Sequence, residues 1–275
     1  MGREEIKRFE WPKGHTSCAT YTLDVDGSTH EFKEGKNVSG NLSIGDYGPR
    51  VGVPRFLNLF EKHGIRASFF IPGWVAERFP DMVREIHQAG HDVAAHGYLH
   101  ESSTEQTHEE KIEVFKRTQK ILSDITGAPC RGLRPIGPAW PSETIRELCK
   151  LGFRYFMTTA DSYYPSKYRF ETGEAMDLLE LNMNWAVDDA RFFWGGSRGG
   201  QYRPLSSFDD AWQIWKGEFD STHEMGGLFN ITAHPRASGR ASTIRVHDRL
   251  IRHIKGTPGA SFAPVSEIAD WVLRK

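Results

Sequence analysis

Short apolar runs alternate with amphipathic segments along almost the whole chain of 275 residues, and this regularity constrains the fold more than any other feature. The run "CATYTLDV" at 18–25 predicts a buried strand, and the apolar residues of 51–65 recur at helical spacing. Similar strand-like runs follow at 66–73, 92–100, 130–136, 153–161 and 226–234. Strands that are separated by helices pair in parallel, so we expect about six to eight parallel strands with helices outside them, as a barrel or a doubly wound sheet.

Three segments between these runs predict loops. Residues 34–50 are polar and rich in glycine, which is typical of a connection rather than of a helix or strand. Two later segments, "DSYYPSKYRF" at 161–170 and "RFFWGGSRGGQY" at 191–202, are rich in aromatic residues. We expect these two aromatic loops to cover a compact pocket.

Charge and cysteine content exclude some partners. The formal net charge is -1, so no basic field would attract nucleic acid or an anionic membrane. The three cysteines, Cys18, Cys130 and Cys149, contain no CxxC pair, which argues against a disulfide framework and for a reducing compartment. Residues 1–15 are charged, and no apolar run approaches about 18 residues, so we expect a cytoplasmic protein without a membrane span.

Chemically capable side chains follow one predicted strand after another. In parallel α/β folds the loops at the C-terminal ends of the strands converge on one edge, and active sites form there. We therefore expect a functional site at these strand ends, which carry Asp24, Asp26, His96, His100, Arg134, Asp188, Asp189 and His234.

The first of these positions is the stretch "LDVDG", which carries two carboxylates. Alternate residues of a strand face the same way, which would place Asp24 and Asp26 on one side with Cα atoms roughly 6–7 Å apart. Two like charges this close repel each other unless a cation or a proton lies between them. The alternative is an ordinary turn that leaves the strand, because "DG" is a common turn signal.

The same stretch also fits an unrelated enzyme class. "YTLDVDGST" resembles the first motif of haloacid-dehalogenase-type phosphatases, and "VDDA" at 187–190 resembles their late acidic motif. That resemblance implies that Asp24 is a phosphoryl nucleophile and Asp26 an acid/base, with magnesium as the cofactor.

The histidines favour a different metal. His96 and His100 form an HxxxH pair directly after an apolar run. Imidazole is a preferred ligand of zinc, whereas magnesium takes oxygen ligands. Two histidines and one carboxylate leave a coordination position for water, which is the arrangement of a catalytic zinc site. The sequence therefore favours zinc chemistry over a magnesium phosphatase.

Four motifs in order carry a resemblance to a known family. "TLDVDG", "HGYLH", "RGLRPIG" and "ITAHP" resemble the motifs of the polysaccharide deacetylase family, carbohydrate esterase family four. The resemblance implies a distorted (β/α) barrel of about seven parallel strands, formed by one catalytic domain over 1–275. "NWAVDD" and "HPRASGR" further resemble a subgroup of peptidoglycan deacetylase-like, allantoinase-like and cyclic imide hydrolase proteins.

The resemblance also implies a role for each site residue. A divalent metal, zinc, would be bound by Asp26, His96 and His100. Asp24 would be the general base and His234 the general acid. Arg134 would hold Asp24, although Arg131 is an alternative because the third motif departs from the family's pattern. The residues expected to bind substrate are Tyr98, Trp140, Trp185 and Asp188.

The function expected from this resemblance is the metal-dependent hydrolysis of C–N bonds other than peptide bonds. We expect the substrate to be a small molecule or a short glycan, because the aromatic loops suit a compact pocket, and the sequence leaves open whether the protein is a homo-oligomer. Two alternatives stay open: a deacetylase of N-acetyl sugar polymers such as peptidoglycan or chitin, and a ligand-binding protein without turnover.

Overall fold

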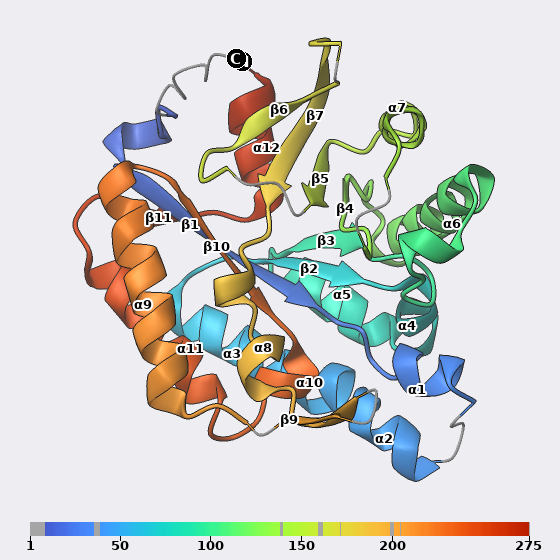
Figure 1. Ribbon diagram of the computed structural model, residues 1–275, viewed down its shortest axis with the longest axis horizontal. Helices are drawn as coiled ribbons and strands as arrows, with labels where there is room; N and C mark the ends of the chain where they lie inside the picture. The colour runs from blue at the N-terminus through green and yellow to red at the C-terminus, as the bar shows by residue number, and fades with distance from the viewer. Residues whose placement is uncertain are drawn as a thin grey trace.

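The computed structural model describes residues 9–35, 39–137, 140–158, 162–170, 172–198, 201–203 and 205–274. One mostly parallel sheet forms its centre (Figure 1). The strands of this sheet are β1 (Ser17–Asp24), β2 (Ser68–Ile71), β3 (Asp92–Ala95), β4 (Gly132–Leu133), β5 (Tyr155–Thr158), β6 (Ser166–Arg169), β7 (Ala175–Asn182), β10 (Leu228–Ala233) and β11 (Ala260–Phe262).

Seven neighbouring strands run parallel, in the order β10-β1-β2-β3-β4-β5-β7. Two more strands extend this sheet: β11 pairs in parallel with the start of β1, and β6 pairs antiparallel with β7. The expected parallel arrangement of about seven strands is therefore confirmed.

The sheet curls so that its two ends approach each other. After β7 the chain forms a short bridge to β10, in which Asp188 pairs with Thr232 and the Asp189 amide donates to the Thr232 carbonyl at 3.0 Å. The Asn230 side chain also donates to the Asn182 carbonyl at 2.7 Å. These contacts bring the last parallel strand back to the first, as in a distorted (β/α) barrel.

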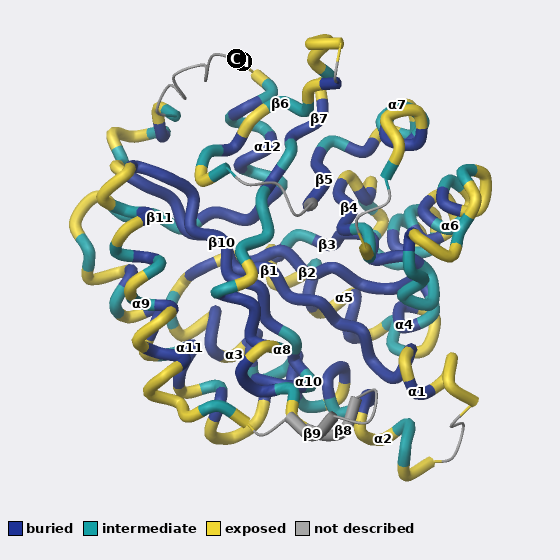
Figure 2. The backbone as a smooth tube through the Cα atoms, in the orientation of Figure 1, coloured by how far each residue is buried: buried dark blue, intermediate teal, exposed yellow. Residues whose placement is uncertain are grey.

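Helices cover the outer face of this barrel, and their apolar sides form its main core. α3 (Val53–His63) contributes Phe56 and Phe60, α9 (Phe208–Met225) contributes Trp215 and α11 (Ile244–Gly256) contributes Leu250, all without exposed surface. Burying one such side chain stabilises the fold by about 1.5–3 kcal/mol. Figure 2 shows the central strands buried and the outward sides of the helices exposed. The helices are α1 (Thr29–Lys33), α2 (Ser39–Tyr47), α3 (Val53–His63), α4 (Gly73–Arg78), α5 (Pro80–Gln88), α6 (His108–Thr126), α7 (Ser142–Lys150), α8 (Ala190–Phe193), α9 (Phe208–Met225), α10 (Pro235–Ser238), α11 (Ile244–Gly256) and α12 (Val265–Leu273).

The expected loop at 34–50 is wrong for most of its length. Residues 39–47 form α2, and a π-helical turn, Gly48–Gly52, joins it to α3. Glycine disfavours a helix by about 1 kcal/mol per residue, but here it allows close packing. A Cβ atom at Gly45 would stand 2.4 Å from the Gly27 carbonyl oxygen, so the helix lies directly against the segment after β1.

The two expected aromatic loops also contain regular structure. Within 161–170, residues 166–169 form β6 on the edge of the sheet. Within 191–202, the end of α8 is followed by a small antiparallel pair, β8 (Gly196–Arg198) and β9 (Gln201–Arg203). Residues 161 and 199–200 of these predictions lie outside the described part of the chain.

Among the described helices, none combines the length and the apolar character that a membrane span requires.

Candidate active site

The candidate site lies at the C-terminal edge of the sheet, where four strands deliver one side chain each. Asp24 is the last residue of β1, and His96, Arg134 and His234 directly follow β3, β4 and β10. The prediction that Asp24 and Asp26 share a strand is wrong, because β1 ends at Asp24. The turn after β1 still brings the Asp26 carboxylate back toward the same centre.

The alternation of β1 explains why Asp24 points into this centre. Tyr21 faces the helices and packs against Phe60, with ring centroids 5.3 Å apart. Thr22 faces the inside of the sheet, where its hydroxyl accepts a hydrogen bond from Arg134 Nη2 at 2.6 Å. Asp24, two residues further on, faces the same side.

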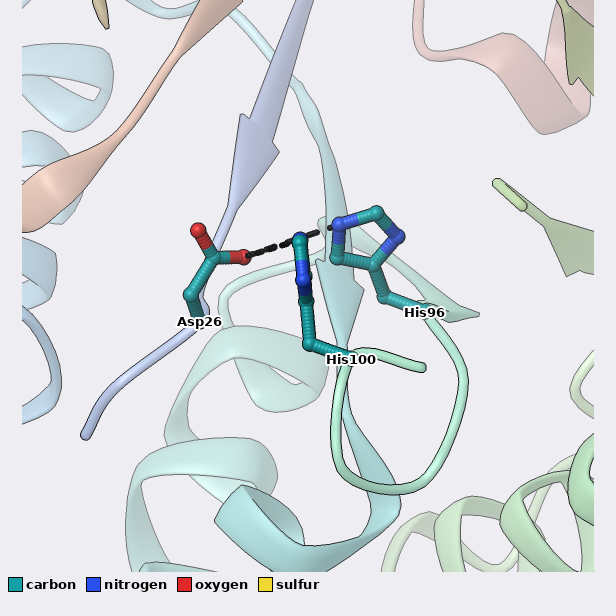
Figure 3. A group of neighbouring side chains, drawn as sticks. All are labelled: Asp26, His96 and His100. Carbon is teal, nitrogen blue, oxygen red and sulfur yellow. Dashed lines mark ion pairs between the residues drawn. The ribbon is translucent and has the colours of Figure 1, made fainter. Parts of the chain in front are cut away.

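Asp26, His96 and His100 form a group with the geometry of metal ligands (Figure 3). Asp26 Oδ1 lies 3.6 Å from His96 Nε2 and 3.9 Å from His100 Nε2. One ligand atom from each residue lies within 4.8 Å of the other two. Asp26 Oδ1 is buried without a hydrogen-bond partner, which is costly for a carboxylate unless a cation occupies the site. The donor set of two imidazoles and one carboxylate fits zinc.

A backbone contact orients the buried His96 ring. His96 Nδ1 lies 2.8 Å from the carbonyl oxygen of Arg134, which can only accept a hydrogen bond. Nδ1 therefore carries the hydrogen, and the lone pair of Nε2 faces Asp26. This is the arrangement that fixes the tautomer of a metal-binding histidine.

The loop "HGYLHE" holds the second histidine in an unusual backbone conformation. His100 has a φ of 57°, in the left-handed region that few residues other than glycine adopt. The Glu101 carboxylate accepts the backbone N–H groups of Tyr98 and Leu99 at 2.9 and 2.8 Å, which stabilises the turn. Lys33 of α1 also donates to the His100 carbonyl at 3.0 Å. The turn directs the His100 ring toward Asp26.

The protonation states of this group suit metal binding. Burial raises the pKa of Asp26, but His100, His234 and His96 outweigh it and bring the pKa to about 2. Burial lowers the pKa of His100 to about 4, against the pull of Asp26. At neutral pH the group therefore offers an anionic oxygen and a neutral imidazole, the forms that bind metals.

One carboxylate oxygen of Asp24 is bound by an arginine, and the other faces the site. Arg134 Nη1 donates to Asp24 Oδ1, and the guanidinium lies over the Phe70 ring at 4.2 Å. Asp24 Oδ2 faces the site, 3.8 Å from Nε2 of both His96 and His234. Arg131 is exposed, so Arg134 is the arginine that contacts Asp24.

His234 is held on its far side by Asp189. The Asp189 carboxylate accepts from His234 Nδ1 at 2.7 Å and from the His234 backbone N–H at 2.8 Å, and Ser238 donates to it as well. Burial lowers the pKa of His234, but the charge and hydrogen bond of Asp189 raise it to about 10. His234 is therefore protonated at neutral pH. Asp188, Asp189 and His234 also lie close enough to share a cation, but His234 Nδ1 already donates to Asp189.

The four residues expected to bind substrate lie in different places. The Tyr98 hydroxyl donates to Glu77 of α4, and Arg117 of α6 covers the ring at 3.5 Å, so this side chain is turned toward those helices. Asp188 accepts from the Ala190 N–H at 2.9 Å and lies 3.7 Å from His234 Nδ1. Trp140 and Trp185 line one cavity beside the site.

Sequence reasoning missed a buried ion pair next to the site. Arg236 Nη2 lies 2.6 Å from Glu31 Oε1, and Arg236 Nη1 donates to the Gly27 carbonyl at 3.3 Å. The same guanidinium lies 4.4 Å from the Trp194 ring, which meets the His234 ring edge-on at 5.5 Å. Arg236 thus joins the turn after Asp26 to the loop of His234. The motif "HPRASGR" contains Arg236, but no pattern in the sequence pointed to Glu31.

Comparisons with known proteins agree with this architecture. The model of the polysaccharide deacetylase family matches residues 44–156. A peptidoglycan deacetylase of Helicobacter pylori is 29% identical over 282 residues, which cover 93% of this chain and 96% of that protein.

Solved structures extend the likeness to the whole fold. A candidate polysaccharide deacetylase from Mycobacterium smegmatis is 30% identical with a TM-score of 0.86, over 96% of this chain and 93% of that one. An allantoinase shares the fold at 23% identity with a TM-score of 0.80, over 95% and 91% of the two chains. The haloacid-dehalogenase-type interpretation is thereby set aside. The chain belongs to the polysaccharide deacetylase family, a family of hydrolases that act on C–N bonds.

Proposed function

We propose that this chain is a metal-dependent hydrolase of C–N bonds outside peptides, acting on an N-acetyl, amide or imide carbonyl. The observation that carries the proposal is the buried, unpartnered Asp26 Oδ1 facing two imidazoles, beside a second carboxylate and a protonated imidazole. We further propose that 1–275 acts as one catalytic domain.

The residues that would hold the ion are Asp26, His96 and His100, and the ion that best fits them is zinc. When bound, such an ion polarises a carbonyl group and lowers the pKa of a water molecule toward about 7. The protein would supply ligands that are prepared for the ion: Asp26 is already ionised, and His96 is already oriented by its hydrogen bond.

Asp24 would accept the proton of the attacking water at Oδ2. Its other oxygen is bound by Arg134, so the carboxylate cannot rotate away. The contacts of Arg134 with Thr22 and Phe70 fix the guanidinium in turn. A proton acceptor held at one point in this way contributes about 10²–10⁴-fold to the rate.

His234 would donate a proton to the leaving nitrogen from Nε2. An amine is a poor leaving group without that proton, and Asp189 stabilises the charged imidazolium that supplies it. Asp24 Oδ2 and His234 Nε2 lie 3.8 Å apart, so the acceptor and the donor can serve one reacting group.

The Helicobacter relative is named for peptidoglycan, so an N-acetyl sugar is the second candidate substrate. The cavity of about 460 Å³ beside Arg134 has the size of a small-molecule pocket, which favours a small substrate or a short glycan over a long polymer. A protein that only binds its ligand would have no use for a protonated acid and a free carboxylate oxygen in contact range.

The test compares the two aspartates at the end of β1. We expect the purified protein to carry about one zinc-like ion per chain and to hydrolyse succinimide or an N-acetylglucosamine oligomer. Asp24→Asn keeps the metal, because it removes only the proton acceptor, and lowers kcat by roughly 10²–10⁴-fold. Asp26→Asn removes an anionic ligand, so metal content itself falls. Mass-spectrometric metal analysis and kcat are measured side by side for both variants.

Asp81→Asn serves as the matched control, because Asp81 is an exposed aspartate on α5 whose side chain is 96% accessible. It leaves metal content and kcat at the wild-type values. If Asp24→Asn loses its metal while Asp26→Asn keeps both metal and activity, the two roles are reversed. Wild-type turnover that persists after complete metal removal contradicts the proposal as a whole.

A further inference from the structure

A cavity of about 460 Å³ adjoins the candidate site and has no part in the chemistry described above. Pro135 and Met157 belong to its wall. Pro135 follows Arg134 in the chain, and the Met157 sulfur lies 3.1 Å from Arg134 Nη2. The same arginine binds Asp24 through its side chain and His96 through its carbonyl. Arg134 therefore lies between the cavity and two site residues, the proposed base Asp24 and the proposed metal ligand His96.

The walls of this cavity are mostly aromatic. Four rings line it, from Trp140, Phe156, Tyr168 and Trp185. The Phe156 ring meets the rings of Trp140 and Tyr168 nearly edge-on, at centroid distances of 6.1 and 6.5 Å. The Trp140 indole N–H is already donated to the Gly137 carbonyl at 3.0 Å, so the apolar part of the ring is left for a ligand.

The charge of the lining restricts the ligand further. Glu180 of β7 also lines the cavity, and no lysine or arginine belongs to the described part of its lining. The described wall therefore offers no cation in direct contact with an anionic group. Aromatic rings and the Met183 side chain instead favour an apolar group, because removing apolar surface from water is worth about 25 cal/mol per Å².

We infer that this side cavity binds a neutral, ring-sized apolar substituent of the substrate, next to the reacting carbonyl. The inference rests on the proposed function and narrows it. The volume of the cavity, about 460 Å³, lies within the range of small-molecule pockets, about 300–1,000 Å³. The enzyme would then distinguish amides or imides that carry such a substituent from unsubstituted ones and from plain N-acetyl sugars.

The test uses two imides that differ by one ring, succinimide and 2-phenylsuccinimide. We expect kcat/KM of the wild type to be roughly 10–100-fold higher for the phenyl compound, the discrimination that an apolar pocket provides. Met183→Phe fills the cavity and should bring the ratio of the two values close to one. The matched control is Met225→Phe at the exposed end of α9, which should leave the ratio unchanged.

A second readout does not depend on turnover. Calorimetry measures binding of 2-phenylsuccinimide to the metal-free protein, with loss of binding expected for Met183→Phe. Trp185→Ala removes part of the cavity wall at an exposed residue, so it is not expected to disturb folding. If both variants lose binding, a folding defect in Met183→Phe does not explain the loss.

The outcomes separate the two proposals. No turnover of either imide or of an N-acetylglucosamine oligomer by the metal-loaded protein contradicts the proposed function, while calorimetric binding still tests the cavity. Turnover with equal kcat/KM for both imides, together with no calorimetric binding, overturns the cavity inference and leaves the proposed function standing.

Discussion

The proton on His234 depends mainly on one neighbouring carboxylate. Burial lowers the pKa of His234, but the charge and hydrogen bond of Asp189, 2.7 Å from Nδ1, and the charges of Asp188 and Asp26 raise it to about 10. A cation held by Asp26 would lower that pKa again, because His234 Nε2 lies only 4.0 Å from Asp26 Oδ2. With a cation in place, the charges of Asp189 and Asp188 would be what keeps His234 protonated.

We expect Asp189→Asn to lower kcat by roughly 10²-fold or more, because the neutral amide no longer stabilises the imidazolium. The high-pH limb of the kcat profile, where His234 loses its proton, should move to lower pH. Metal content should stay at the wild-type value. The measurement combines a pH–rate profile with metal analysis. Asp209→Asn, at an exposed aspartate paired with Arg249, is the control, and an unshifted profile in Asp189→Asn contradicts the role of His234 as acid.

At the residue level, the sequence predicted which strand ends carry the site but not the contacts between them. Asp24 and His96 could be found because a polar side chain directly follows a buried run. Asp188 and Asp189 are adjacent, and no periodicity distinguishes them once the chain has left a strand. Their roles are set by the bridge from Asp188 to Thr232, which places Asp189 against His234.

Among the elements, the π-helical turn before α3 packs directly against the start of α10, the helix that follows His234. A Cβ atom at Gly52 would stand 2.2 Å from the Pro235 carbonyl oxygen. Pro235 is the first residue of α10 and directly follows His234. The absence of a side chain at Gly52 therefore lets the two segments touch through their backbones.

We expect Gly52→Ala to lower the free energy of unfolding by roughly 1–3 kcal/mol, because the added methyl forces this contact apart. The matched variant is Gly217→Ala in the middle of α9, where a Cβ atom would meet nothing within 4 Å. It should raise the free energy of unfolding by about 0.5–1 kcal/mol, since alanine is the better helix former. Urea denaturation measures both, and equal stability of the two variants contradicts the packing argument.

The same contacts explain why the element prediction failed at 34–50. Glycine and polar residues indicate a loop when only local preferences are considered. Here they allow α2 to approach the turn after β1, where Asp46 accepts from Arg78 at 2.8 Å and from Ser28 at 2.6 Å. Tertiary contacts between distant segments outweigh local preference, and a single sequence does not show them.

For the whole molecule, the alternation of strands and helices was enough to predict a parallel α/β fold, because few architectures bury strands of that kind. That alternation left a barrel and a doubly wound sheet open, and the family resemblance was what favoured the curled sheet. It rests on a bridge of single residues between Asp188 and Thr232 and on the contact of Asn230 with Asn182. The antiparallel strand β6 was missed because its residues are largely exposed and have no apolar period.

The fold also buries two histidines that take no part in the site, and this couples its stability to pH. Burial lowers the pKa of His247 to about 3, and burial together with Arg66 lowers the pKa of His91 to about 4. The His91 ring accepts the Ala67 N–H at 3.1 Å, which requires a neutral Nδ1. Unfolded, both histidines would titrate near pH 6.5.

We therefore expect stability to be lost as the pH falls from about 6.5 toward 3–4. In that range the unfolded chain binds protons at these positions and the native chain does not, which costs up to about 1.4 kcal/mol per pH unit for each histidine. His247→Phe removes one of the two titrating groups, so the slope of unfolding free energy against pH should fall by about one proton between pH 5.5 and 4. Denaturant titrations of chelator-treated protein give this slope for wild type and variant, so contributions from the site cancel in the difference.

His30→Gln, at an exposed histidine paired with Glu34, should keep the wild-type slope. Parallel slopes for wild type and His247→Phe would mean that His247 is protonated inside the native fold.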